Sequence, residues 1–117
     1  MKAFLVISHG SYSPKLLEEV VQLVKILQGK INFPICEYAF LEITQPDIPQ
    51  GIKNCVDKGA KEITILLNFL NSGRHVNQDV PRIVGEMSKQ YPHVKMTITK
   101  PIGQHPKIPE LFTDYLS

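Results

Sequence analysis

The sequence has few cysteines, no concentration of charge and no long hydrophobic run, and each shortage argues against a class of protein. Its two cysteines, Cys36 and Cys55, lie nineteen positions apart without a CxxC pair. We therefore expect neither a disulfide framework nor a cysteine zinc site, and we interpret both as small core residues in a reducing cytosol. The formal net charge is only +2, whereas nucleic-acid-binding proteins usually carry a clustered basic face. No nucleic-acid partner is expected.

Targeting and nucleotide-binding motifs are also missing. The first apolar run, residues 3–7, stops at Ser8-His9-Gly10 and is too short for a signal peptide or a membrane span. We interpret it as a buried strand of a cytoplasmic protein that has no membrane partner. Neither GxxxxGK[ST] nor GxGxxG occurs, and Ser8 and Ser11 lack the G-x-S-x-G elbow of serine hydrolases. These absences argue against phosphate chemistry and against serine hydrolysis.

Strand and helix patterns alternate strictly along the chain. Apolar segments at residues 2–8, 34–41 and 62–68 predict buried strands, and the alternating segment 94–99 predicts an edge strand. A helical pattern follows each of them. At 117 residues we expect a single domain spanning 1–117. The alternation predicts an α/β fold, a four-stranded parallel sheet with right-handed crossovers and helices on both faces, as in small flavodoxin-like proteins.

Helix starts and buried helix faces are marked by local signals. Ser13-Pro14 predicts the start of a helix that ends near Gly29. Thr44-Gln45-Pro46-Asp47 resembles a capping box that opens a second helix, which Gly59 closes. Asp79, with Pro81 two residues on, predicts the start of a third helix that runs to about residue 91. The fourth helix is expected to bury one apolar stripe: Ile108, Leu111, Phe112 and Tyr115.

Polar residues follow the strands at their carboxyl ends, which lie on one edge of a parallel sheet. Ligands of open α/β sheets bind at this edge. The residues that we expect there are Ser8, His9, Glu42, Asn68, Gly73, Arg74, His75, Lys100 and His105. Individually, His9 fits a polar cap as well as a functional group, Glu42 fits a solvated carboxylate, and His105 fits a helix cap better. His93 precedes the fourth strand and is interpreted as a surface residue of the opposite edge.

Imidazole and carboxylate groups at an open edge indicate metal or proton chemistry. Neutral imidazole binds cobalt, nickel, iron and zinc. A site with two or three protein ligands leaves coordination positions free for an exchanging ligand, unlike a closed structural site. A histidine without a metal, or Glu42, would instead accept protons near neutral pH. The residues alone leave both roles open.

The motifs together resemble those of the small CbiX-type sirohydrochlorin chelatases of the class II chelatase superfamily. The resemblance covers essentially the whole chain in the same order. The matching segments are Ser8-His9-Gly10-Ser11, Glu37-Tyr38-Ala39-Phe40-Leu41-Glu42, Gln45-Pro46-Asp47-Ile48, Phe69-Leu70, Gly73-Arg74-His75-Val76, Asp79-Val80-Pro81 and Gly103-Gln104-His105-Pro106.

The resemblance implies insertion of a divalent metal, Co²⁺ first and Fe²⁺ or Ni²⁺ next, into the octacarboxylate tetrapyrrole sirohydrochlorin, for cobalamin or siroheme synthesis. It implies that His9 and His75 handle the metal and that Glu42 assists. Arg74, Lys100, Ser8, Gly73 and Asn68 would contact the substrate. It also implies a homodimer with its cleft between subunits and no tightly bound cofactor. The alternatives are a metal or tetrapyrrole carrier that does no catalysis, and a flavodoxin-like regulatory domain. Asn68 and Asn71-Ser72 are more polar than the residues of many relatives.

Overall fold

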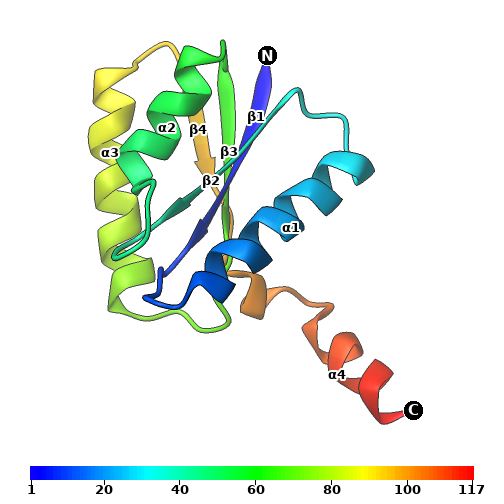
Figure 1. Ribbon diagram of the computed structural model, residues 1–117. Coiled ribbons are helices and arrows are strands. Elements are labelled where there is room, and N and C mark those ends of the chain that lie inside the picture. The colour runs from blue at the N-terminus through cyan, green and yellow to red at the C-terminus, as the bar shows by residue number, and fades with distance from the viewer.

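The computed structural model describes the backbone of residues 1–117 and every side chain except that of His75, so the role predicted for that imidazole lies outside the described residues. One parallel sheet runs in the order β2-β1-β3-β4 (Figure 1). Its strands are β1 (Lys2–Ser8), β2 (Ile35–Phe40), β3 (Glu62–Leu67) and β4 (Lys95–Ile98). The predicted four-stranded parallel α/β sheet is confirmed. The central pair is β1 and β3, and β4 is an edge strand as expected.

Burial of β1 on both faces explains its central place. Ala3, Leu5 and Ile7 join one large apolar cluster, whereas Phe4 and Val6 join a smaller cluster on the other face. A strand whose consecutive residues are all apolar is typical of a sheet that helices cover on both sides. The unbroken hydrophobic run of the first strand is therefore the sequence signal for its position.

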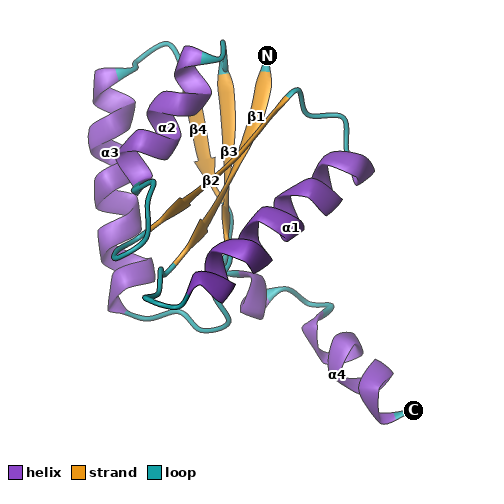
Figure 2. Cartoon of the chain, in the orientation of Figure 1, coloured by secondary structure: helices purple, strands orange, loops and turns teal.

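Helices cover the two faces unequally, as Figure 2 shows. The larger apolar cluster lies under α2 (Ile48–Asp57) and α3 (Val80–Gln90). Only α1 (Pro14–Lys30) packs on the other face, against β1 and β2. Its predicted start is confirmed, because the Ser13 side chain accepts a hydrogen bond from the Lys15 N–H at 3.3 Å.

The second and third helices begin differently from simple capped helices. The cap of α2 is Asp47, whose carboxylate accepts from the Gln50 N–H at 2.9 Å, whereas Thr44 bonds elsewhere. Asp79 stands at the N-cap position of α3, where the sequence predicts the helix start. It has helical backbone angles (φ −70°, ψ −44°), because a π-helical turn, η1 (His75–Asp79), precedes α3. Turns of this kind are frequent at functional sites.

The last helix is the largest departure from expectation. A 3₁₀ turn, η2 (Ile102–Gln104), leads to α4 (Ile108–Leu116), which projects away from the sheet (Figure 1). The prediction that Ile108, Leu111, Phe112 and Tyr115 point inward is wrong, since none of the residues of α4 is buried. Among the helices described, none is long and apolar enough to cross a bilayer.

Candidate functional site at the carboxyl edge of the sheet

Backbone hydrogen bonds between β1 and β2 continue past the strands and place Glu42 beside His9. The Ser8 carbonyl accepts from the Leu41 N–H at 2.9 Å, and the His9 carbonyl accepts from the Glu42 N–H at 3.0 Å. Gly10 then turns the chain with φ +109°, and a Cβ there would overlap the Glu42 carbonyl. This close approach of two backbones requires glycine.

A second link fixes the loop that follows Glu42. The Thr44 hydroxyl accepts from the Ser11 N–H and donates to the Ser11 carbonyl, both at 2.9 Å. Between these anchors Ile43 has φ +69°, a region that costs a β-branched residue roughly 1–2 kcal/mol. Thr44 thus joins the two loops instead of capping a helix, a role that a local capping pattern could not reveal.

Neighbouring β1 and β3 are joined at the same edge by side chains as well as backbone. The Asn68 N–H donates to the Ile7 carbonyl at 2.8 Å, and Asn68 Nδ2 donates to Ser8 Oγ at 3.0 Å. Ser8 is the one buried polar residue recorded among the described side chains, with 2% of its surface exposed. Its hydroxyl is therefore satisfied by Asn68, which is only partly buried.

The imidazole of His9 is exposed to solvent but has a fixed neighbour. Its ring is perpendicular to the ring of Phe69, with centroids 4.5 Å apart and an interplanar angle of 89°. Phe69 is itself buried, with 3% of its surface exposed. An aromatic wall of this kind restricts the rotamers of an otherwise free histidine. Phe69 was not predicted to have this role.

The edge strand β4 is tied to the same point through Gly103. Its N–H donates to the Phe69 carbonyl at 3.0 Å, and a Cβ on Gly103 would overlap the Leu70 carbonyl. The loop after β4 therefore holds the backbone of Phe69, and through Phe69 the ring beside His9. Gly103 belongs to the motif Gly103-Gln104-His105-Pro106, but no positioning role was predicted for it.

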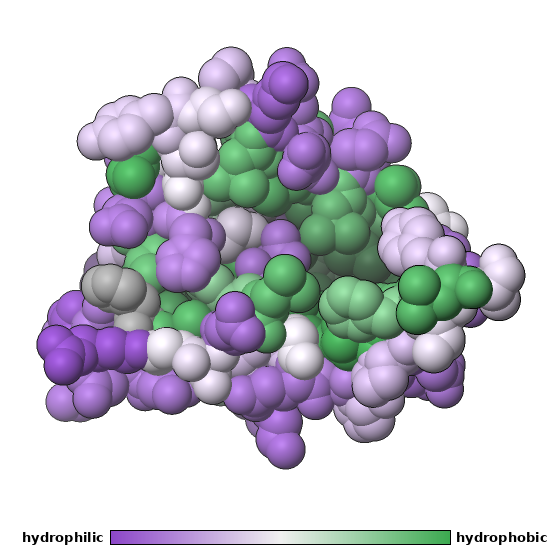
Figure 3. Space-filling model, turned by 90° about the horizontal axis from the view of Figure 1, so that it is seen from below, coloured by the Kyte–Doolittle hydropathy of each residue, from purple (hydrophilic) through white to green (hydrophobic). Residues whose placement is uncertain are grey.

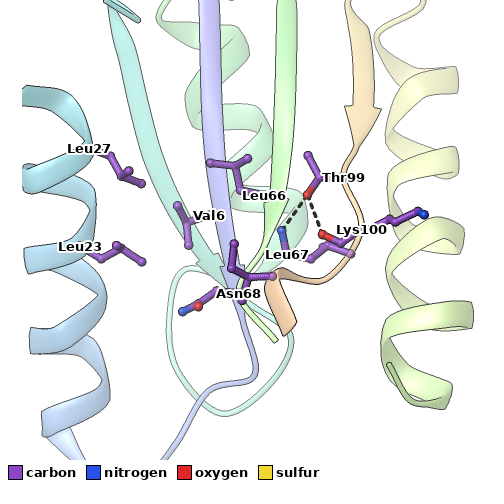
Figure 4. A pocket seen from close by; sticks show the side chains of 9 residues that line it. Val6, Leu23, Leu27, Leu66, Leu67, Asn68, Thr99 and Lys100 are labelled. Atoms are coloured by element: carbon purple, nitrogen blue, oxygen red, sulfur yellow. Dashed lines mark hydrogen bonds between the residues drawn. The ribbon is translucent and has the colours of Figure 1, made fainter. Parts of the chain in front are cut away.

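The structure brings Ser8, His9, Glu42 and Asn68 together on one edge. Lys100 lines the same apolar groove as Asn68, with its side chain extending away from Asn68 in Figure 4. Figure 3 looks onto the edge and shows hydrophobic side chains around a hollow, with hydrophilic ones outside.

The remaining predicted residues, Gly73, Arg74 and His105, lie in the loops of the same edge. Arg74 and Gly73 are exposed and precede η1. Gly73 has no special backbone conformation, since its φ lies outside the left-handed region, and open space surrounds the position of a Cβ. His105 acts as a local cap, as favoured from sequence, since its Nδ1 accepts from the Lys107 N–H at 3.0 Å.

The side chains described form no group of three or more histidine, cysteine or acidic residues that could hold a metal ion. The imidazole of His9 is exposed to solvent. Such a group can bind a metal that still carries exchangeable ligands, or it can accept a proton.

Comparison with known proteins decides the family. A sequence model named CbiX matches residues 3–117. The chain belongs to the CbiX family. It is 29% identical over 110 residues to the chloroplastic sirohydrochlorin ferrochelatase of Arabidopsis thaliana, covering 94% of this chain and 49% of that protein. It is 31% identical over 114 residues to the sirohydrochlorin cobaltochelatase of Sulfolobus acidocaldarius, covering 97% of this chain and 89% of that protein.

The fold of this CbiX chain also matches a solved chelatase. The sirohydrochlorin chelatase SirB of Bacillus subtilis subspecies spizizenii, crystallised with cobalt, superposes with a TM-score of 0.88 at 26% identity. The match covers 98% of this chain and 49% of SirB. The CbiX chain thus spans about half the length of SirB and of the Arabidopsis relative.

Proposed function

We propose that this protein inserts a divalent metal ion into sirohydrochlorin. The observation that carries the proposal is the exposed His9 imidazole, held against Phe69 and next to Glu42 at the ligand-binding edge of a CbiX chain. The names of the relatives mention both cobalt and iron. Co²⁺ is our first choice of metal and Fe²⁺ or Ni²⁺ the next, because imidazole and carboxylate ligands accept all three.

Metal insertion requires two exchanges that these groups fit. The macrocycle gives up two N–H protons, and its four nitrogens replace ligands of the incoming ion, so that M²⁺ and sirohydrochlorin yield the metallated product and two protons. His9, with His75 as its proposed partner, holds the ion while pyrrole nitrogens replace water. A histidine not bound to metal, or Glu42, accepts the protons. The metal is a substrate here, and no tightly bound cofactor is proposed.

Binding of the macrocycle is proposed to use its carboxylates. Arg74 and Lys100 are exposed cations near the edge and suit charge-assisted hydrogen bonds to these groups. Asn68 is proposed to contact the macrocycle at the sheet edge. The buried Ser8 would act indirectly, because its hydroxyl accepts a hydrogen bond from the Asn68 amide. Gly73 leaves space beside Arg74 for the substrate.

We further propose that two copies form the working unit. The macrocycle is large and flat, so one open sheet edge provides only one wall for it. A second copy would supply the other wall. The cytoplasm is the proposed compartment, where sirohydrochlorin and reduced metal ions would be available.

The proposal is tested by the absorption spectrum of sirohydrochlorin after addition of Co²⁺ or Fe²⁺. We expect the spectral change to be faster with the protein than in buffer alone. His9→Ala or His75→Ala should lower the rate of metal insertion by the protein by roughly 100-fold or more. His93→Ala is the matched control, since His93 is exposed beyond the opposite ends of the strands. Full activity in both site variants would refute the assignment, and stoichiometric binding without turnover would identify a carrier instead.

A further inference from the structure

The loop between β2 and α2 makes a tight turn directly after Glu42. The Thr44 N–H donates to the Glu42 carbonyl at 2.7 Å, and Ile43 lies at the centre of this three-residue turn with φ +69°. Three-residue turns with positive φ are rare and strained, and such a conformation persists only where the surrounding structure fixes it. The carboxylate proposed to assist metal insertion is therefore attached to a backbone that needs support from other parts of the chain.

The side chain of Thr44 supplies such support. Its hydroxyl accepts from the Ser11 N–H and donates to the Ser11 carbonyl, both at 2.9 Å. The two residues are 33 positions apart in the sequence, and they lie on the neighbouring loops that follow β2 and β1 (Figure 1). The two bonds therefore fix the position of one loop relative to the other.

The loop that receives these bonds is fixed at its own end. Ser11 Oγ accepts from the Ser13 N–H at 3.0 Å, and Ser13 caps α1. Two positions before Ser11, the His9 carbonyl accepts from the Glu42 N–H at 3.0 Å. The strained turn is thus held at both ends by one loop, at Glu42 by His9 and at Thr44 by Ser11.

We propose that Thr44 is a positioning residue, whose hydroxyl holds Glu42 next to His9 for metal insertion. Without the hydroxyl, the turn at Ile43 can relax to a negative φ, and Glu42 then moves relative to His9. Because Glu42 is exposed, its side chain gains little from packing and its place depends mainly on the backbone. The inference rests on the proposed function, since Glu42 takes part in catalysis only if the protein inserts a metal.

Removal of the hydroxyl should slow the reaction and leave substrate binding nearly unchanged. In assays of cobalt insertion, kcat of Thr44→Val should fall about tenfold because the carboxylate is displaced, while KM for sirohydrochlorin should change by less than about twofold. Thr44→Ser, which keeps the hydroxyl, should recover most of kcat. Thr113→Val is the matched control, because it removes a hydroxyl bonded to a carbonyl at 2.9 Å on α4, away from the sheet edge.

A double variant separates positioning of Glu42 from a general structural effect. If Thr44 acts through Glu42, Thr44→Val should change kcat by less than about twofold once Glu42→Gln has removed the carboxylate. A merely structural role would lower kcat by the same factor in both backgrounds, and that result would overturn the inference. An unchanged kcat in Glu42→Gln itself, or equal kcat values for Thr44→Ser and Thr44→Val, would overturn it as well.

Amide hydrogen exchange tests the position of Glu42 without catalysis. The Glu42 N–H should exchange at least about tenfold faster in Thr44→Val than in the unmodified protein, since its bond to the His9 carbonyl opens more often. The Asn68 N–H is the control, because it bonds to the Ile7 carbonyl on the other side of β1 and should exchange at an unchanged rate.

Circular dichroism checks that each variant is folded, and Thr44→Ala replaces Thr44→Val if valine does not fit at this position. An unchanged exchange rate of the Glu42 N–H in the folded variant would overturn the inference. If the unmodified protein does not accelerate metal insertion at all, the proposed function fails. The exchange rates then still decide whether Thr44 holds Glu42 in place.

Discussion

The rings of His9 and Phe69 stand perpendicular to each other with centroids 4.5 Å apart, although the two residues are sixty positions apart in the sequence. Phe69 is buried and His9 is exposed. The pair therefore joins the hydrophobic core to the group proposed to hold the metal. The orientation of the imidazole depends on packing beneath it as well as on its own backbone.

Replacing Phe69 should lower activity more than its effect on stability explains. Phe69→Leu removes the aromatic contact, worth about 0.5–1.5 kcal/mol, and we expect the rate of metal insertion to fall by up to about tenfold. The control is Phe4→Leu, since Phe4 is equally buried in the smaller cluster and lies near the other end of β1. Equal loss of rate in both variants, measured where both are fully folded, would show that Phe69 contributes only stability.

Substitution of Gly10 should damage both stability and the position of Glu42. Gly10→Ala places a Cβ against the Glu42 carbonyl at φ +109°, so we expect a loss of at least about 2 kcal/mol in denaturant unfolding. Gly85→Ala is the control, because Gly85 lies in α3 with open space around it. That change should stabilise the protein by roughly 0.5–1 kcal/mol. A tolerated Gly10→Ala would contradict the close approach of the two loops.

The bond between Asn68 and Ser8 should show as a coupling energy. A double-mutant cycle of Asn68→Ala and Ser8→Ala, measured by denaturant unfolding, should give a coupling free energy of roughly 0.5–1.5 kcal/mol. The reason is that Ser8 is buried and its hydroxyl has the Asn68 amide as its partner. The exposed pair Gln50 and Asn54, joined at 2.8 Å on α2, serves as control. Its coupling should stay below about 0.5 kcal/mol. Equal couplings would mean that burial of Ser8 does not strengthen the contact.

Stability should fall at alkaline pH because of Cys55. Burial raises the pKa of this thiol from 9.0 to about 12. Below pH 9 both folded and unfolded thiols are protonated, and above it the unfolded chain ionises first, so the free energy of unfolding decreases as pH rises. Between pH 8 and 10 the free energy of unfolding should fall by about 1.4 kcal/mol more for the unmodified protein than for the Cys55→Ala variant. Parallel stability curves for the two proteins, from urea unfolding, would contradict this.

The sequence predicts those features that depend on local pattern. Unbroken apolar residues mark β1, Ser13-Pro14 marks the start of α1, and parallel strands then bring His9, Glu42 and Asn68 to one edge. The features missed depend on contacts between distant residues or on the geometry of a single turn. Thr44 has the same local pattern whether it caps a helix or bonds Ser11. The stripe on α4 predicts that one side is to be covered, but the direction of the helix is set by the turn at His105.

The central claim, that His9 is at the metal site, is tested most directly by a crystal structure of the protein soaked with Co²⁺ and recorded at the cobalt absorption edge. We predict one cobalt ion within about 2.0–2.3 Å of an imidazole nitrogen of His9, with His75 turned toward the same ion. Cobalt bound in full occupancy elsewhere, with none beside His9, would contradict the account.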